Sequence, residues 1–135
     1  MADISITDAS VNLTSGQTNT LDAGETIAAG DLLYLNSTDN KVYQASNVTS
    51  VSTATVIGMA LNNAGADQPV TYVMNGGVIN IGAVLTVGTV YVLSEAGLMA
   101  PDTDRASNDY VSVIAIPSTT SILELTIINS GVQVP

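Results

Sequence analysis

The chain has 135 residues, enough for one domain with a hydrophobic core, and its net charge is −10 because 12 Asp and Glu residues outnumber two cations, Lys41 and Arg105. It contains no Cys and no His, which excludes disulfides and thiolate metal sites and removes the commonest general base. So anionic a chain should bind neither nucleic acid nor an anionic membrane, because both interactions depend on Lys and Arg.

The first 20 residues are expected to form an N-terminal arm ahead of a single β domain that covers residues 21–135. Residues 3–7 alternate between polar and apolar at the strand period, residues 11–13 do so briefly, and residues 15–20 are wholly polar. This predicts one short strand followed by an extended, partly mobile segment. Two interpretations stay open: a frayed terminus, or an arm that orders against a neighbouring subunit.

Two stretches of the β domain share one pattern. In each, a short apolar lead ends at a glycine, Gly30 or Gly88, and a leucine closes the stretch five residues later. A turn-rich segment follows, and then an apolar run that contains Ile57 or Ile114. The offset between the copies is 58 residues at the glycines and 57 at the isoleucines. The two stretches are Thr26–Leu35 (TIAAGDLLYL) and Gly82–Leu93 (GAVLTVGTVYVL).

Hydrophobic residues make up 46% of the chain but aromatic residues only 4%, so the core must consist of small, β-branched and aliphatic side chains, which suit pleated sheets. No convincing amphipathic helix is present. The uncharged run over residues 68–94 alternates and contains Pro69, so it predicts buried strands and no membrane span. Beyond the arm, strands are predicted at 31–35, 41–45, 55–61, 69–74, 78–81, 89–93, 110–116 and 122–128.

The predicted fold is therefore all-β: a small β-barrel, β-tulip-like or sandwich domain of about nine to ten short strands, built from two similar β units. The sheet edges of such a fold are poorly guarded, since Lys, which usually protects an edge strand, occurs once. An oligomer or a closed barrel would hide these edges.

The sequence holds no catalytic constellation, and we expect no enzyme activity and no cofactor. Its Ser and Thr hydroxyls lack an activating base. Asp102, Asp104 and Asp109 lie in one acidic loop, residues 101–109, and could bind Ca²⁺. Their spacing matches neither an EF-hand loop nor a Gly-rich nonapeptide repeat, so a solvated loop that pairs internally with Arg105 is the favoured interpretation.

Several runs of the sequence resemble a group of small structural proteins of tailed bacteriophages and prophages that are similar to capsid decoration (cement) proteins. The resemblance covers roughly residues 21–135 and consists of patterns of glycine, β-branched residues and turns. The runs are AGETIAAGDLLYL, VIGMALNNAGADQPVTYVMNGG, IGAVLTVGTVYVLS, AGLMAPDTD and DYVSVIAI.

This resemblance implies a β-rich subunit, a homotrimer, on the outer capsid surface of a virion. It would bridge major capsid proteins and stabilise the expanded shell against the pressure of packaged DNA. In such families an N-terminal arm often contacts the major capsid protein. We therefore expect Ile4, Ile6, Val11 and Leu13 to contact the capsid or a neighbouring subunit.

The alternative is a ligand-binding β module, such as the glycan-binding part of a tail fibre or of a surface adhesin. It requires exposed tyrosines that can stack on sugar rings. Most of the tyrosines fall inside predicted strands, so packing in the core or an interface is the favoured role. The five candidates are Tyr34, Tyr43, Tyr72, Tyr91 and Tyr110.

Overall fold

The computed structural model describes residues 3–135 and is all-β, as predicted, with 41% of residues in strands. Three antiparallel sheets make up a sandwich, and none of them closes into a barrel. Two short 3-10 turns, η1 (Asp8–Ser10) and η2 (Asp102–Asp104), interrupt the strands. The strands are β1 (Asn12–Ser15), β2 (Thr18–Asp22), β3 (Leu32–Asn36), β4 (Lys41–Gln44), β5 (Gly58–Ala60), β6 (Pro69–Met74), β7 (Val78–Asn80), β8 (Tyr91–Leu93), β9 (Met99–Pro101), β10 (Tyr110–Ala115), β11 (Ile122–Glu124) and β12 (Ile128–Gln133).

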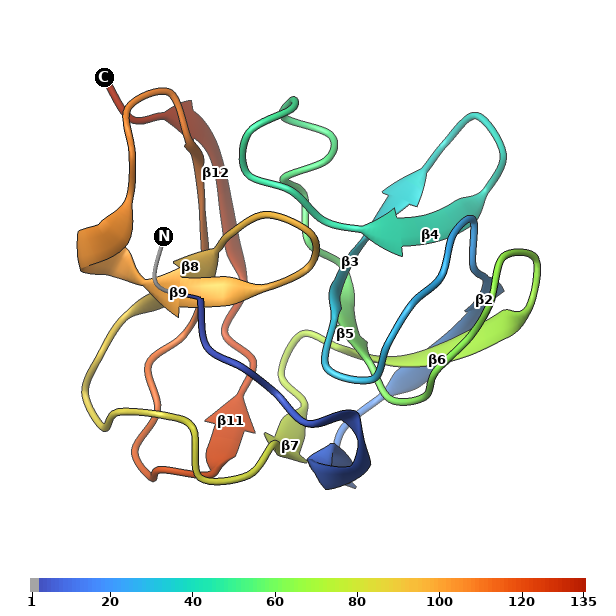
Figure 1. Ribbon diagram of the computed structural model, residues 1–135, viewed down its shortest axis with the longest axis horizontal. Helices are drawn as coiled ribbons and strands as arrows, with labels where there is room; N and C mark the ends of the chain where they lie inside the picture. Colours follow the sequence, from blue (N-terminus) through green and yellow to red (C-terminus); the bar gives the residue numbers. More distant parts are fainter. Residues whose placement is uncertain (1–2) are drawn as a thin grey trace.

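The sheets are arranged in two lobes that lie side by side (Figure 1). One lobe is the five-stranded sheet, ordered β2-β6-β5-β3-β4. The other contains the four-stranded sheet β12-β10-β8-β9 and the three-stranded sheet β1-β7-β11. The larger core cluster draws on all three sheets, with Leu32 and Met59 from the first lobe and Leu93, Ile114 and Leu123 from the second. The lobes therefore share one hydrophobic core. In the described part of the chain, no helix has both the length and the apolar character that crossing a bilayer would require.

The two similar units predicted from the sequence have the same strand order and register. In both, a hairpin is extended by a third antiparallel strand, β4-β3-β5 in one lobe and β9-β8-β10 in the other. Every hairpin pair of the second unit matches a pair of the first, at an offset of 58 residues in one strand and 57 in the other. The pairs are Leu33–Gln44, Tyr34–Tyr43 and Leu35–Val42 in the first unit, and Tyr91–Pro101, Val92–Ala100 and Leu93–Met99 in the second.

The repeated glycines occupy equivalent turns. Gly30 and Gly88 both have positive φ, 96° and 80°, a conformation that side chains with a Cβ disfavour. The N–H of Gly30 donates to the carbonyl of Ala60 at 2.8 Å, and that of Gly88 donates to the carbonyl of Pro117 at 3.0 Å. These bonds tie the first turn to the last residue of β5 and the second turn to the chain just after β10. The glycine repeat in the sequence thus reports a repeated backbone conformation.

An edge carbonyl is capped at the same position in both units, by different segments. The N–H of Gly24 donates to the carbonyl of Val42 in β4 at 2.9 Å. In the second unit the equivalent carbonyl, of Met99 in β9, accepts from Ile4 at 3.0 Å. The first unit is thus completed by the residues that lead into it, and the second by the N-terminal segment.

Side-chain hydrogen bonds from one lobe hold the backbone of the other. Asn129 of β12 accepts from the N–H of Val56 at 3.0 Å, and its amide donates to the carbonyl of the same residue at 3.1 Å. The buried hydroxyl of Ser112 donates to the carbonyl of Ala54 at 2.5 Å. These side chains therefore attach the loop before β5 to β10 and β12.

The N-terminal segment differs from its prediction. Residues 3–7 form no strand, whereas β1 overlaps the brief alternation at residues 11–13, and β2 begins within the polar residues 15–20. β1 pairs with β7 and β2 pairs with β6, so neighbouring strands satisfy their backbone groups although their side chains are polar. The boundary expected after residue 20 therefore falls inside β2.

The C-terminal strand prediction also needs correction. The run 122–128, predicted as one strand, is split between β11 and the start of β12, which belong to different sheets. Between them Leu125 donates to the carbonyl of Gly77, and Thr126 donates to the carbonyl of Ile114. The chain thus changes sheet within this run. β12 continues to Gln133.

Candidate functional site

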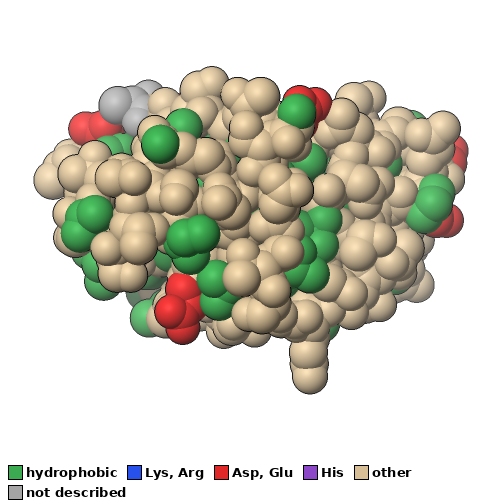
Figure 2. All heavy atoms as spheres, turned by 90° about the horizontal axis from the view of Figure 1, so that it is seen from below, with side chains coloured by type: hydrophobic (Ala, Val, Ile, Leu, Met, Phe, Trp, Pro, Cys, Tyr) green, Lys and Arg blue, Asp and Glu red, His purple; other side chains and the backbone are tan. Residues whose placement is uncertain are grey.

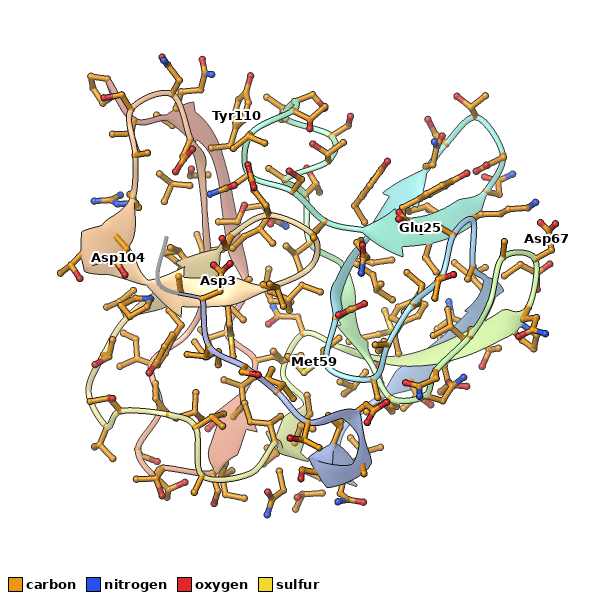
Figure 3. All side chains as sticks on the ribbon, in the orientation of Figure 1. Asp3, Glu25, Met59, Asp67, Asp104 and Tyr110 are labelled. Atoms are coloured by element: carbon orange, nitrogen blue, oxygen red, sulfur yellow. The ribbon has the colours of Figure 1, made fainter. Side chains whose placement is uncertain are left out.

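Most carboxylates are dispersed over the surface, but Asp31 and Asp109 are buried, and Asp109 accepts from the N–H of Ala106 at 2.9 Å. The labelled acids Asp3, Glu25, Asp67 and Asp104 lie on different parts of the molecule (Figure 3). Among residues 3–135, no three acidic, His or Cys side chains are grouped so that they could hold a metal ion. In the acidic loop the guanidinium of Arg105 contacts the carboxylate of Asp102 at 3.0 Å, so that carboxylate is engaged by an internal ion pair.

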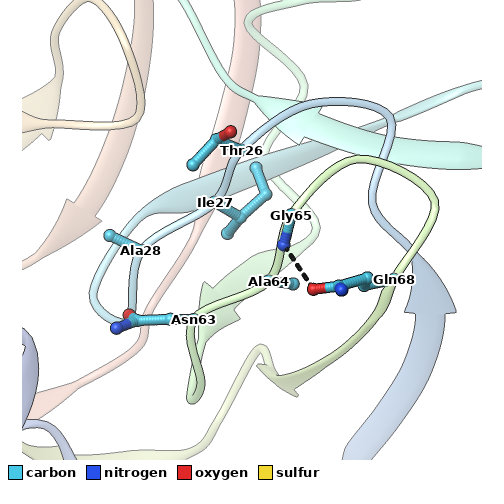
Figure 4. A pocket seen from close by; sticks show the side chains of 7 residues that line it. All are labelled: Thr26, Ile27, Ala28, Asn63, Ala64, Gly65 and Gln68. Carbon is cyan, nitrogen blue, oxygen red and sulfur yellow. Dashed lines mark hydrogen bonds between the residues drawn. The ribbon is translucent and has the colours of Figure 1, made fainter.

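The surface hollows are shallow. One lies between residues 26–28 and 63–68, and its lining consists of uncharged side chains (Figure 4). Within it the N–H of Gly65 donates to the side-chain oxygen of Gln68 at 2.9 Å, so this oxygen already has a hydrogen-bond partner within the protein. Such a site offers a ligand neither charge nor an aromatic platform.

The five tyrosines divide into two groups. Tyr72 and Tyr91 are buried, and the hydroxyl of Tyr91 accepts from the N–H of Thr86 at 2.9 Å, so both belong to the core. Tyr34 and Tyr43 are half-buried partners across β3 and β4, and their rings stack with centroids 5.8 Å apart. Tyr110, also half-buried, starts β10.

Tyr34 and Tyr43 lie among acidic groups. The Tyr43 hydroxyl donates to the carboxylate of Asp39 at 2.5 Å, which raises the pKa of Tyr43 and lowers that of Asp39. Partial burial, followed by the charges of Glu25 and Asp39, raises the pKa of Tyr34. Lys41 pairs with Asp67 nearby, and this bond raises the pKa of the ammonium. At neutral pH both tyrosines are therefore neutral, and Asp39 is ionised.

A second hollow lies beside Tyr34. Its other lining residues come from the hairpin between β3 and β4 and from the loop before β5, and nearly all carry hydroxyl or amide groups. An aromatic ring with surrounding hydroxyls is the usual composition of a sugar subsite. The lining residues are Tyr34, Leu35, Asn36, Ser37, Thr38, Ser52 and Thr53.

The structure directs three of the four predicted contact residues into their own subunit. Ile4 and Ile6 are half-buried and pack on the core, and Val11 is buried. Leu13 in β1 is different, because this residue is 40% exposed. Of the predicted set, Leu13 alone therefore presents a large apolar surface to a partner.

Sheet edges provide the other surfaces for assembly. The edge of β4 faces the end of β2 through the bridge between Ala23 and Val42, and the edge of β9 is covered at Met99 by Ile4. In the described chain β1, β11 and β12 each pair on one side only, with no strand on the other. β11 is three residues long and carries the exposed Glu124, so β1 and β12 are the open edges without charge.

β12 is the larger of the two open edges. All six of its residues are exposed, including Ile128 at 57% and Val132 at 62%. The loop before β5 adds Val51, exposed by 48%, whose methyl group lies beside Gly131. Figure 1 shows this loop next to β12. We call β12 together with Val51 the β12 surface.

The β12 surface is uncharged on a strongly anionic chain. Residues 42–66, which include the loop before β5, and residues 125–135, which include β12, contain no charged side chain. Elsewhere too, much of the exterior consists of uncharged polar groups and backbone, as one face shows (Figure 2). The sequence signal for this surface is the absence of charge from the C-terminal eleven residues.

Comparison with known proteins adds no family: no protein-family model matches the chain, and no curated protein matches its sequence.

Proposed function

We propose that this chain is a structural protein of a virion that decorates the outer capsid surface as a homotrimer. There it bridges major capsid proteins and stabilises the expanded shell. Two lines of argument support the proposal: the resemblance of residues 21–135 to phage decoration proteins, and the surfaces of the fold. The observation that carries most weight is the β12 surface, which is exposed and free of charge and presents Ile128, Val132 and Val51 to solvent.

A surface of this kind suits contact with another protein. Exposed apolar side chains gain free energy when a partner removes them from water, at about 25 cal/mol per Å². An open strand edge adds unpaired backbone groups that a partner strand can satisfy. Because the β12 surface has no charge, its burial does not require the desolvation of a charged side chain.

The mechanism is repeated clamping. Each copy makes modest contacts with its neighbours, and capsid symmetry repeats these contacts over the shell. Linked contacts behave as multivalent binding, in which the second contact forms at a high effective concentration. Opening the shell at one point then requires several contacts to break together.

Quantitative mass spectrometry of purified particles from the source phage or induced prophage tests this proposal. We expect the chain at an abundance near that of the major capsid protein. A few copies per particle would indicate a tail or fibre component, and complete absence from the particle would contradict a virion role.

A second candidate function is glycan binding, favoured by the stacked Tyr34–Tyr43 pair beside the hydroxyl-lined hollow. A glycan array, followed by titration of any hit with tyrosine fluorescence as readout, tests it, because the chain has no Trp to mask the signal. Binding that Tyr34→Ala abolishes and Tyr110→Ala leaves unchanged would support this function. An array without hits at high protein concentration would reject it.

A further inference from the structure

A three-fold ring requires two different surfaces on each subunit. In a two-fold dimer the same patch meets itself, but in a ring of three a surface of one copy meets a different surface of the next. The proposed trimer therefore needs a matched pair of surfaces on this chain. Both must be accessible, and they must not repel each other although each copy carries a net charge of −10.

The open edges of the described chain supply such a pair. The edge of β4 faces Ala23 at the end of β2, and Ile4 covers β9 at Met99, while β2 and β11 carry exposed carboxylates at Asp22 and Glu124. β1 and β12 remain, and both consist of exposed, uncharged residues. They belong to different sheets, so pairing between copies would join the two sheets into one.

The two edges are chemically alike. β1 presents Leu13 among Asn, Thr and Ser, and β12 presents Ile128 and Val132 among Asn, Ser and Gln. Apolar cross-strand neighbours stabilise such a pairing, and the polar neighbours can exchange hydrogen bonds. Between anionic copies a contact free of charge avoids like-charge repulsion. A cationic partner would instead be drawn to the carboxylates elsewhere on the surface.

We propose that β12 of one copy pairs edge to edge with β1 of the next copy, and that three such contacts close a ring. This inference rests on the proposed trimer and names its interface. The neighbour's four-stranded sheet then continues the three-stranded sheet, so β1 and β12 are both buried in the assembly. It gives a subunit contact to Leu13, which is exposed, whereas Ile4, Ile6 and Val11 pack against the core of their own subunit.

Cysteine cross-linking tests the pairing directly, because the natural chain has no Cys. Leu13→Cys and Val132→Cys are made singly and together, and each variant is treated with a short bis-maleimide, which tolerates uncertainty in the strand register. Val87→Cys, at an exposed apolar residue outside both edges, is the matched control. Thermal unfolding followed by circular dichroism confirms that each variant is folded.

We expect an equimolar mixture of the two single variants to give a cross-linked dimer that contains one chain of each, identified by peptide mass spectrometry. The double variant should give covalent trimers. Neither single variant alone should cross-link efficiently, nor should a mixture of Val87→Cys with either. Dimers of Val132→Cys alone would show that β12 meets itself, and would overturn the proposal.

The cross-linking reaction is repeated on purified particles, so that a trimer which forms only when the chain binds the capsid is also detected. Failure of the mixed cross-link both at high concentration in solution and on particles would also overturn the proposed interface. The result is separable from the virion role. Abundant copies on the particle without the cross-link would reject the interface alone. Cross-linked trimers of a chain that is absent from particles would reject only the virion role.

Discussion

The β3-β4-β5 and β8-β9-β10 units share a backbone frame and differ in what covers it. At equivalent positions the first unit has the half-buried pair Tyr34–Tyr43, and the second has Val92 and Ala100, both buried. The hydrogen-bonding register is the same although the side chains and their exposure are not. The comparison indicates that the repeated turns and apolar spacing determine the strand pairing of a unit, while the segments packed around it determine which of its side chains are exposed to solvent.

The two units also differ in the segment that caps the edge carbonyl. The first unit uses its own leading residue, Gly24, and the second uses Ile4, which comes from the far end of the sequence. In the second unit the equivalent leading chain is committed elsewhere, since Ile81 donates to the carbonyl of Ser121. The N-terminal segment thus completes a unit that cannot complete itself.

The largest expected difference between the units concerns their equivalent isoleucines. Ile114 is fully buried, whereas Ile57 is half-buried at the margin of the smaller cluster. We expect Ile114→Ala to lower the free energy of unfolding by about 3–5 kcal/mol and Ile57→Ala by about 1–2 kcal/mol, because the buried site keeps a cavity. Chemical denaturation measures both. Equal losses would mean that the two sites are packed alike.

The glycine turns should differ next. Substitution of either glycine by alanine is strained by the positive φ, at about 1–3 kcal/mol. A Cβ at Gly30 would also lie 2.9 Å from Ile6 Cγ2, whereas a Cβ at Gly88 would have no atom within 4 Å. We expect Gly30→Ala to destabilise by about 1 kcal/mol more than Gly88→Ala. Thermal unfolding of both variants, alone and combined with Ile6→Ala, checks this. If the N-terminal segment causes the difference, Ile6→Ala removes it.

The attachment of the two lobes depends on Asn129. Asn129→Ala leaves both backbone groups of the buried Val56 without that partner, and we expect a loss of about 1–3 kcal/mol. Asn129→Asp is the matched control: it retains the acceptor for the N–H of Val56 and loses the donor. Denaturation should rank the wild type above the Asp variant, and the Asp variant above the Ala variant. No loss in the Ala variant would contradict the role of this side chain.

The smallest effect concerns the surface pair of the first unit. The bond from Tyr43 lowers the pKa of Asp39, so its contribution is present above the unfolded pKa of that acid and disappears as the pH falls through the lowered value. The same bond raises the pKa of Tyr43, so the contribution is also lost as the pH rises through that raised value. Tyr43→Phe should therefore lower the melting temperature slightly near neutral pH and not in acid. A difference that persists at pH 2 would contradict this assignment.

Much of this fold could be predicted from local sequence, and the failures have physical causes. The glycine repeat, the turns and the alternation of residues 69–74 identified the units and β6. β1 and β2 escaped notice because their side chains are polar and partners far along the chain satisfy their backbone. The change of sheet after β11 depends on bonds to Gly77 and Ile114, which no local pattern encodes.

The candidate surface was predicted only in part. The resemblance suggested an outward contact for the N-terminal arm, whereas Ile4 and Ile6 are half-buried and pack against the subunit's own core, and the N–H of Ile4 caps β9 at Met99. The C-terminal run is notable in the sequence only for its composition, which lacks charged residues. That composition could not show that residues 128–133 form the last strand of a sheet, since this depends on pairing with β10.

Hydrogen–deuterium exchange of this chain, free at low concentration and bound in purified particles, tests assembly through β1 and β12 most directly. If these edges form the contacts, exchange on particles is slower in β1 and β12 and unchanged at the hollow beside Tyr34. Unchanged exchange at both edges, with protection at the Tyr34 hollow or elsewhere, would contradict assembly through these edges.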